Sequence, residues 1–307
     1  MNYVFASMNV LKAGESSVEQ RRKDWATIAK MFLDCGVDII SLQEVFHEKP
    51  VEMLRELLSR YSLRGDEWAS DFKYQPTVRN DYEGYAFLWN TRTISLLVDE
   101  GGKTYQPLIQ ARYSRTVKRP PYVGRFMPAT DRGPLLEFRI INTHLIFGKD
   151  AYKKEQDCTD SDLKLRLAEY EKLSHEIFAK VSSPLPEGST SQRIAYTFIN
   201  GDYNLLLNRH CRMIDGPLPA PDDSIQTLRS KRISFQCDAT TISSNGQGYT
   251  NNDYDHCTSS GREGEYLTVS RISGPEMYCN GNFDLYRRTI SDHVPIFMIF
   301  NINPRRG

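Results

Sequence analysis

The sequence lacks any long apolar run. No hydrophobic stretch approaches the roughly 20 residues that a helix needs to span a bilayer,. The first residues also lack the charged region, apolar region and small-residue cleavage site of a secretory signal,. We therefore expect neither a membrane span nor a membrane partner, and we expect a cytoplasmic location.

The six cysteines show no CxxC pairing. Zinc ribbons and disulfide frameworks both place their cysteines at short, repeated intervals. The sequence therefore predicts neither, and scattered thiols fit a reducing cytoplasm.

The chain also lacks net charge, because 39 Lys and Arg residues balance 39 Asp and Glu residues. The field of the whole protein offers no general attraction to a polyanion. Any affinity for nucleic acid must come from a local patch. One candidate is the run 112–132, where six Lys or Arg residues stand against Asp131 alone. A solvated loop is the alternative interpretation of this run.

Short runs rich in β-branched and aromatic residues have the length of strands. Two longer segments, 17–35 and 162–181, carry apolar residues at helical spacing, and Asp162 suits the cap position of the second,. Strands alternating with helices predict an α/β or α+β fold, here as a single domain over residues 1–307. The expected strands are 3–6, 38–42, 85–89, 135–141, 194–199 and 294–302.

Polar side chains follow several of these apolar runs or precede the last one. In layered α/β folds such strand ends converge on one rim, where active sites form. The sequence therefore predicts that these side chains meet. They are Asn9, Glu44, His144, Asp202, Asn204, Asp255, Asp292 and His293.

These residue types fit metal-dependent hydrolysis of a phosphoester. A phosphodiester is anionic and repels hydroxide, so a hard cation must neutralise the charge that develops on a phosphoryl oxygen. Glu44, Asp292 and Asn9 offer the oxygen ligands that Mg²⁺ or Mn²⁺ prefers. Asp, Asn and His can share the proton transfers, each contributing roughly 10²- to 10⁴-fold. Singly, each residue has an ordinary structural interpretation; the combination indicates catalysis.

The ordered motifs resemble those of the endonuclease/exonuclease/phosphatase superfamily, which includes deoxyribonuclease I, sphingomyelinases and inositol-polyphosphate 5-phosphatases. They run from Ser-Met-Asn9 to Ser-Asp292-His293 and span nearly the whole chain. The resemblance implies a four-layer αββα sandwich, in which helices flank two packed mixed β-sheets and the site lies at one end of the sheets. The intervening motifs are Leu-Gln-Glu44, Asn-Thr-His144, Gly-Asp202-Tyr-Asn204 and Tyr-Asp255.

Within the superfamily, three features are similar to deoxyribonuclease I and the cytolethal distending toxin nucleases. Residues 82–88 resemble the strand that supplies a glutamate, here Glu83, to a catalytic histidine. Residues 250–255 resemble a Thr-Asn-x-x-Tyr-Asp stretch, and Arg119 precedes two prolines where this branch places a phosphate-contacting arginine. The resemblance therefore implies a Mg²⁺- or Mn²⁺-dependent nuclease, with endonucleolytic cleavage of DNA as the expected activity.

The resemblance also implies a role for each motif residue. Glu44, with Asn9 and Asp292, would hold the metal. Asp202 would orient or deprotonate the attacking water. Phosphate oxygens would be bound by Arg119, Asn204 and Thr250.

Two imidazole–carboxylate dyads complete the implied site. His144 would be backed by Glu83, and His293 by Asp255. Such a carboxylate sets the imidazole tautomer and raises its basicity. The motifs leave open which histidine acts as base and which as acid.

One departure concerns the expected substrate. Phe46 stands where deoxyribonuclease I carries a minor-groove arginine, so cleavage of relaxed double-stranded DNA is not implied. Stacking on an unpaired base and packing in the core are both open to Phe46. Packing is the expectation.

Two alternatives stay open. A phosphatase or phospholipase acting on inositol phosphate or sphingomyelin is the first, although three leucines follow Asn204 where 5-phosphatases have an arginine. A non-catalytic binding module is the second, although such a module would be expected to lose metal or histidine positions. A nuclease inside its own cell needs control, so an inhibitor or regulatory protein is a further expected partner.

Overall fold

The computed structural model describes residues 2–14, 23–74, 83–97, 116–129, 136–147, 160–183, 194–207, 232–235 and 238–302. Across these ranges, no helix is both long enough and apolar enough to cross a bilayer. Part of the basic run 112–132 lies outside them, and so does part of the segment 17–35.

The described strands form two six-stranded sheets. In order across the first sheet they are β11 (Leu267–Arg271), β12 (Ile296–Asn301), β1 (Asn2–Ala13), β2 (Ile39–Val45), β4 (Gly84–Asn90) and β3 (Trp68–Tyr74). In order across the second they are β5 (Ile94–Leu96), β6 (Tyr122–Pro128), β7 (Leu136–His144), β8 (Ile194–Asp202), β10 (Asp255–Ser260) and β9 (Arg232–Phe235).

Both sheets are mixed. β1 pairs with β2 in parallel, and β7 pairs with β8 in parallel, whereas the other described pairs are antiparallel. Parallel neighbours end at the same edge of a sheet, so each central pair delivers two chain segments to one place.

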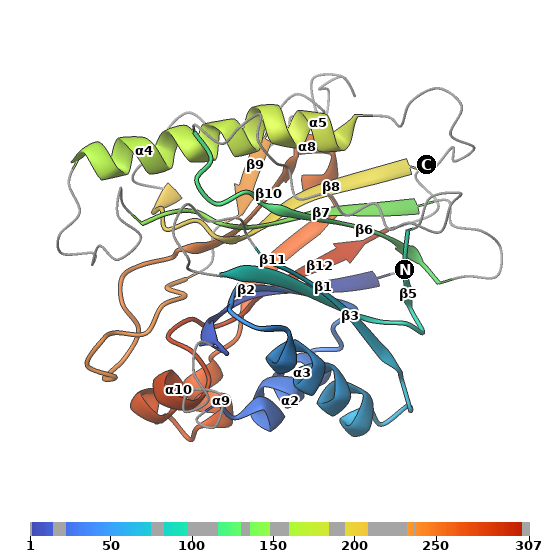
Figure 1. The fold of residues 1–307 in the computed structure, drawn as a ribbon, viewed down its shortest axis with the longest axis vertical. Helices are drawn as coiled ribbons and strands as arrows, with labels where there is room; N and C mark the ends of the chain where they lie inside the picture. The colour runs from blue at the N-terminus through green and yellow to red at the C-terminus, as the bar shows by residue number, and fades with distance from the viewer. Residues whose placement is uncertain are drawn as a thin grey trace.

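Helices cover the outer face of each sheet (Figure 1). The first sheet is covered by α2 (Trp25–Asp34), α3 (Glu48–Tyr61), α9 (Gly274–Tyr278) and α10 (Phe283–Thr289). The second is covered by α4 (Asp160–Glu171), the π-helical segment η2 (Lys172–Ile177) and α5 (Phe178–Ser182), and the short α8 (Gly261–Gly264) joins β10 to β11. This arrangement confirms the predicted four-layer sandwich of two packed mixed sheets.

Three hydrophobic cores fill the spaces between the layers. Successive strand residues point to opposite faces, so Phe5 enters the core between the sheets while Ala6 enters the core under α2. Likewise Ile140 faces the first sheet and Ile141 faces α4 and α5. Full burial of a phenylalanine or isoleucine side chain stabilises the fold by roughly 1.5–3 kcal/mol.

The element ends differ from the sequence-based expectation. The Asp24 side chain accepts from the Thr27 N–H at 3.0 Å and caps α2, which begins at Trp25. Asp162 lies inside the first turn of α4 and not at its cap, so that prediction was wrong. β7 and β8 continue beyond their apolar runs to His144 and Asp202, because these polar ends pair with each other. His144 and Asp202 therefore lie within strands and not after them.

Candidate active site

The site begins where β7, β8 and β10 meet. His144 and Asp202 are the last residues of the parallel strands β7 and β8, and they are register partners. Asp255 opens β10 and is the antiparallel partner of Asp202. Strand pairing alone therefore places three predicted site residues side by side.

Asn9 connects this edge to the first sheet. Its Nδ2 donates to Glu44 Oε1 at 3.0 Å and to Asp202 Oδ2 at 3.1 Å, and its Oδ1 accepts from the Leu11 N–H at 2.9 Å. Asn9 is almost completely buried. One amide thus sets the relative position of two carboxylates that belong to different sheets.

The backbone around Asn9 and Glu44 is strained. β1 changes register between Asn9 and Ala13, and Leu11, Lys12 and Glu44 have φ angles of 46°, 53° and 55°. Each non-glycine residue in this region costs of order 1–3 kcal/mol. The strained turn brings the Lys12 N–H to Glu44 Oε2 at 3.1 Å, so it holds the glutamate in place.

The first predicted dyad forms around His144. Its Nδ1 lies 2.6 Å from Glu83 Oε1, and Arg119 Nη2 lies 3.2 Å from Glu83 Oε2. Burial raises the pKa of Glu83, but Arg119 and His144 outweigh burial and lower that pKa to about 2. Burial and Arg119 lower the pKa of His144, but Glu83 and Asp202 outweigh them and raise it.

The second predicted dyad forms around His293. Its Nδ1 lies 2.7 Å from Asp255 Oδ2. Burial lowers the pKa of His293, but Asp255 and Asp202 raise it well above its ordinary value. Burial raises the pKa of Asp255. Unlike Glu83, Asp255 has no arginine among its ion-pair partners in the described ranges.

Both dyads face the same carboxylate oxygen. His144 Nε2 lies 3.5 Å from Asp202 Oδ2, and His293 Nε2 lies 3.6 Å from the same atom. Because each Nδ1 is held by its own carboxylate, each Nε2 is available at the shared position. A group bound beside Asp202 can therefore exchange protons with two imidazoles.

Three residues predicted to bind phosphate have other contacts here. Arg119 is only 13% exposed and donates from Nη1 to the Leu145 carbonyl at 3.4 Å. Asn204 Nδ2 donates to the same carbonyl at 2.8 Å, and the Asn204 N–H donates to Asp202 Oδ1 at 2.9 Å. The Thr250 hydroxyl contacts that of Thr241, whose backbone bridges to His293. All three border the dyads, and their phosphate roles stay predictions.

Two of the three residues predicted to hold a metal, Glu44 and Asp292, fit a hard cation, whereas the Oδ1 of Asn9 accepts from the Leu11 N–H. Burial raises the pKa of Glu44, and nearby Glu83 and Asp292 raise it further. Asp292 Oδ1 is buried without a hydrogen-bond partner among the described atoms. No three His, Cys, Asp or Glu side chains in the described ranges form a ready-made metal cluster. Mg²⁺ commonly binds through one or two carboxylates and keeps several waters, so Glu44 and Asp292 suit it.

Glu169 is a site-supporting residue that the sequence interpretation missed. It is fully buried on α4; its Oε1 accepts from the N–H groups of Lys118 at 2.7 Å and Arg119 at 3.4 Å, and its Oε2 accepts from that of Ile146 at 3.1 Å. It therefore holds the segments that flank both the first dyad and the end of β7. The available signal was a charged residue on the buried face of an amphipathic helix.

Phe46 does not behave as expected. It is half-buried and belongs to none of the three hydrophobic cores. The expectation that it packs in the core was wrong. Its N–H donates to the Ala13 carbonyl at 2.8 Å, which ties the end of β2 to the strained turn of β1.

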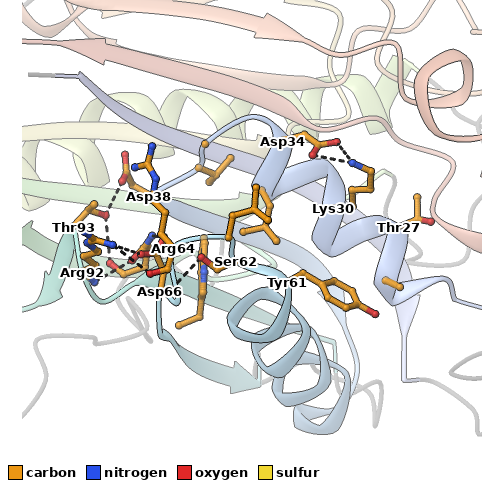
Figure 2. Close-up of a pocket in the computed structure, with 17 residues that line it drawn as sticks. Thr27, Lys30, Asp34, Asp38, Tyr61, Ser62, Arg64, Asp66, Arg92 and Thr93 are labelled. Atoms are coloured by element: carbon orange, nitrogen blue, oxygen red, sulfur yellow. Dashed lines mark hydrogen bonds and ion pairs between the residues drawn. The ribbon is translucent and has the colours of Figure 1, made fainter.

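The cavity drawn in Figure 2 lies away from the dyads. It has a volume of about 700 Å³ and includes Asp38, which immediately precedes β2, whereas Glu44 stands near the end of that strand. Two ion pairs line it: Arg92 Nη1 lies 3.2 Å from Asp66 Oδ1 and Lys30 Nζ lies 2.7 Å from Asp34 Oδ2. This cavity is therefore not part of the candidate active site.

Comparison with solved structures identifies the fold. An endonuclease/exonuclease/phosphatase family protein from Bacteroides thetaiotaomicron matches 98% of this chain and 99% of its own, at 14% identity and a TM-score of 0.55. A mannosyl-6-phosphatase from the same organism matches 96% of this chain and 98% of its own, at 16% identity and a TM-score of 0.55. ANGEL2, a 2′,3′-cyclic phosphatase, matches 98% of this chain and 95% of its own, at 14% identity and a TM-score of 0.58.

The chain therefore has the fold of the endonuclease/exonuclease/phosphatase proteins, as its motifs predicted. No protein-family model matches the sequence, and no curated protein matches it. At such low identity the structural likeness shows the fold alone. What this chain does has to be argued from its own site.

Proposed function

We propose that the protein is a metal-dependent phosphoesterase of the endonuclease/exonuclease/phosphatase superfamily, and specifically a nuclease that hydrolyses DNA. The observation that carries the proposal is the approach of His144 Nε2 and His293 Nε2 to one oxygen of Asp202, at 3.5 and 3.6 Å. Hydrolysis of a phosphodiester needs one group that accepts a proton from water and another that donates one to the leaving oxygen. Two buried imidazoles around one carboxylate meet that need.

The chain's own residues divide the remaining work. Asn9 holds Glu44 and Asp202 in register, and Glu83 and Asp255 orient the two imidazoles. Mg²⁺ or Mn²⁺ held by Glu44 and Asp292, with Asn9 adjacent, would supply neutralisation of charge on the phosphoryl oxygens. Both imidazoles and the carboxylates of Glu83, Asp202 and Asp255 are buried, which strengthens the electrostatic interactions among them, since little water is present to screen them,.

The choice of a nuclease rests on the branch-specific residues. Glu83 backs His144 in the structure, at the position where the deoxyribonuclease I branch places a glutamate. Two of the solved neighbours are named a mannosyl-6-phosphatase and a 2′,3′-cyclic phosphatase, so this fold also serves other phosphoesters. Phosphatase and phospholipase activities are therefore the alternatives that an experiment must exclude.

A substrate panel tests the proposal. The protein would be incubated with supercoiled plasmid, single-stranded DNA, RNA, an inositol phosphate, sphingomyelin vesicles and bis-p-nitrophenyl phosphate in Mg²⁺ or Mn²⁺, with EDTA as control. DNA cleavage that EDTA abolishes is the expected result. Turnover of the inositol phosphate or sphingomyelin without polynucleotide cleavage would transfer the assignment to that substrate class.

A cytoplasmic location and a protein inhibitor complete the proposal. Within the part of the chain that the structure describes, neither Cys35 nor Cys279 forms a disulfide, which supports a reducing compartment,. Fractionation of the source cells tests the location. Recovery of a co-purifying protein that lowers the rate of the purified nuclease would test the inhibitor.

A further inference from the structure

Among the residues that the structure describes, the candidate site contains many carboxylates and few cations. Glu44, Glu83, Asp202, Asp255 and Asp292 all lie at one end of the two sheets, as their hydrogen bonds and mutual electrostatic effects show. A substrate with more than one phosphate brings additional negative charge to this surface. The site therefore needs a cationic side chain for any phosphate that lies beside the scissile one.

Arg119 is poorly suited to that task. Its guanidinium is 13% exposed, pairs with Glu83 at 3.2 Å and donates to the Leu145 carbonyl. Moving it toward a substrate would leave the buried Glu83 carboxylate without its cation, which is costly. The geometry instead makes Arg119 part of the support of His144.

Arg287 on α10 has the opposite properties. Its side chain is 34% exposed, and its Nη2 lies 4.0 Å from Asp292 Oδ2. Its Nε makes no hydrogen bond to the described atoms. A long, partly exposed ion pair of this kind holds a guanidinium weakly. Arg287 is thus a loosely held cation at the outer side of a predicted metal ligand.

The neighbouring arginine shows what an ordinary surface arginine of this helix does. Arg288 Nη2 lies 2.8 Å from Asp284 Oδ2 one helical turn away, and both side chains are more than half exposed. This pair lies within α10 and involves no residue of the candidate site. Arg288 is therefore a matched control for Arg287.

We propose that Arg287 binds a phosphate of the substrate that lies next to the scissile phosphate. The inference rests on the proposed nuclease function, since a polynucleotide carries a further phosphate beside each scissile one. A guanidinium donates two parallel hydrogen bonds to a phosphate, so Arg287 contributes to affinity for the polynucleotide and not to the chemical step.

The test compares Arg287→Ala, Arg287→Lys and Arg288→Ala on two substrates, a single-stranded oligonucleotide and bis-p-nitrophenyl phosphate. Arg287→Ala is expected to raise the oligonucleotide KM about tenfold or more, with kcat little changed. Arg287→Lys keeps the charge and recovers part of the loss, while Arg288→Ala stays within about twofold. The small ester has no neighbouring phosphate, so its kcat/KM should change by less than about twofold in all three variants.

A binding measurement gives a second readout. Fluorescence anisotropy of a labelled oligonucleotide would be recorded against salt concentration in Mg²⁺, in a His144→Ala background in which cleavage is strongly slowed. Loss of one phosphate contact lowers the slope of log K against log salt by about one. Arg287→Ala should show that decrease and Arg288→Ala should not.

The outcomes separate the two proposals. If the parent cleaves the oligonucleotide and Arg287→Ala keeps both its KM and its salt slope, the role of Arg287 is overturned while the nuclease stands. An equal loss on both substrates would also overturn it, because Arg287 would then act on the site itself. If the parent turns over only the small ester, the nuclease proposal fails first and removes the phosphate that Arg287 was to bind.

Discussion

The two dyads share one geometry, a carboxylate oxygen beside an imidazole Nδ1, but different residues hold the carboxylate in place. In each, a carboxylate oxygen lies within 2.7 Å of an imidazole Nδ1. Behind Glu83 stands Arg119, which is itself anchored through its backbone to Glu169. Asp255 is instead held by the pairing of β10 with β8 and by the Thr240 hydroxyl, which accepts from the Asp255 N–H at 3.2 Å.

The two dyads therefore differ in whether the cation beside the carboxylate can lose its charge. Arg119 cannot release its proton in a folded protein, so the first dyad always contains a buried cation. His293 can release its proton, so the second dyad can become neutral on one side. Loss of the carboxylate should therefore affect the two dyads unequally.

The largest expected difference is in stability. Glu83→Gln leaves Arg119 buried beside a neutral amide, and breaking a buried ion pair in this way costs about 3–5 kcal/mol of unfolding free energy. Asp255→Asn should cost clearly less, because His293 can deprotonate. Urea unfolding of both variants at neutral pH measures the difference, and equal losses would contradict the comparison.

A double variant sharpens the same point. In Glu83→Gln with Arg119→Met neither charge is left unpaired, so the double variant should be more stable than Glu83→Gln alone. If adding Arg119→Met destabilises the protein further, the unpaired cation is not the cause of the loss.

The second largest effect should come from lowering the pH, which is expected to reduce the stability that Glu83 contributes. The pKa of Glu83 falls from its ordinary 4.5 to about 2 on folding. A depressed carboxyl pKa gives stability that is complete above about pH 4.5 and is lost as the pH falls toward 2. The stability gap between the parent and Glu83→Gln should therefore narrow over that window, by at most about 3 kcal/mol. A gap that stays constant from pH 5 to pH 2.5 would contradict this assignment.

Activity should fall in both carboxylate variants by similar amounts. Glu83→Gln and Asp255→Asn each remove the group that orients an imidazole, a change that typically costs about 10- to 100-fold. Initial rates on bis-p-nitrophenyl phosphate, measured where both variants are folded, give the ratio. If one variant keeps the rate of the unmodified protein, the dyad that it alters does not take part in catalysis.

The smallest expected effect concerns the loop beside His293. The Thr250 hydroxyl contacts Thr241 and accepts from the Asn252 N–H at 3.1 Å. Thr250→Ala should lower the unfolding free energy by about 1 kcal/mol, the usual value of such contacts. Thermal unfolding and oligonucleotide KM would be compared, and a tenfold rise in KM would restore Thr250 as a phosphate ligand.

The strand and helix pattern predicted an α/β or α+β fold, because it depends on local periodicity. The four-layer sandwich followed from the resemblance of the ordered motifs to those of a known superfamily. The sequence also predicted that strand ends bring His144 and Asp202 to one rim, and the parallel strands β7 and β8 do end side by side at these residues,. It could not predict that Arg119 turns toward Glu83, because that contact depends on how β6 and β4 stack across two sheets. Arg287 was also missed, since no motif marks a loosely paired arginine on a short helix.

The central claim is that the two dyads form one catalytic centre around Asp202. Rates of metal-dependent phosphodiester hydrolysis in His144→Ala, His293→Ala and the double variant test it most directly. We predict that each single variant loses at least about 100-fold and that the double variant is little slower than the slower single one, because groups that act in one step are not additive. Near-parental rates in either single variant, or losses that multiply in the double variant, would contradict the claim.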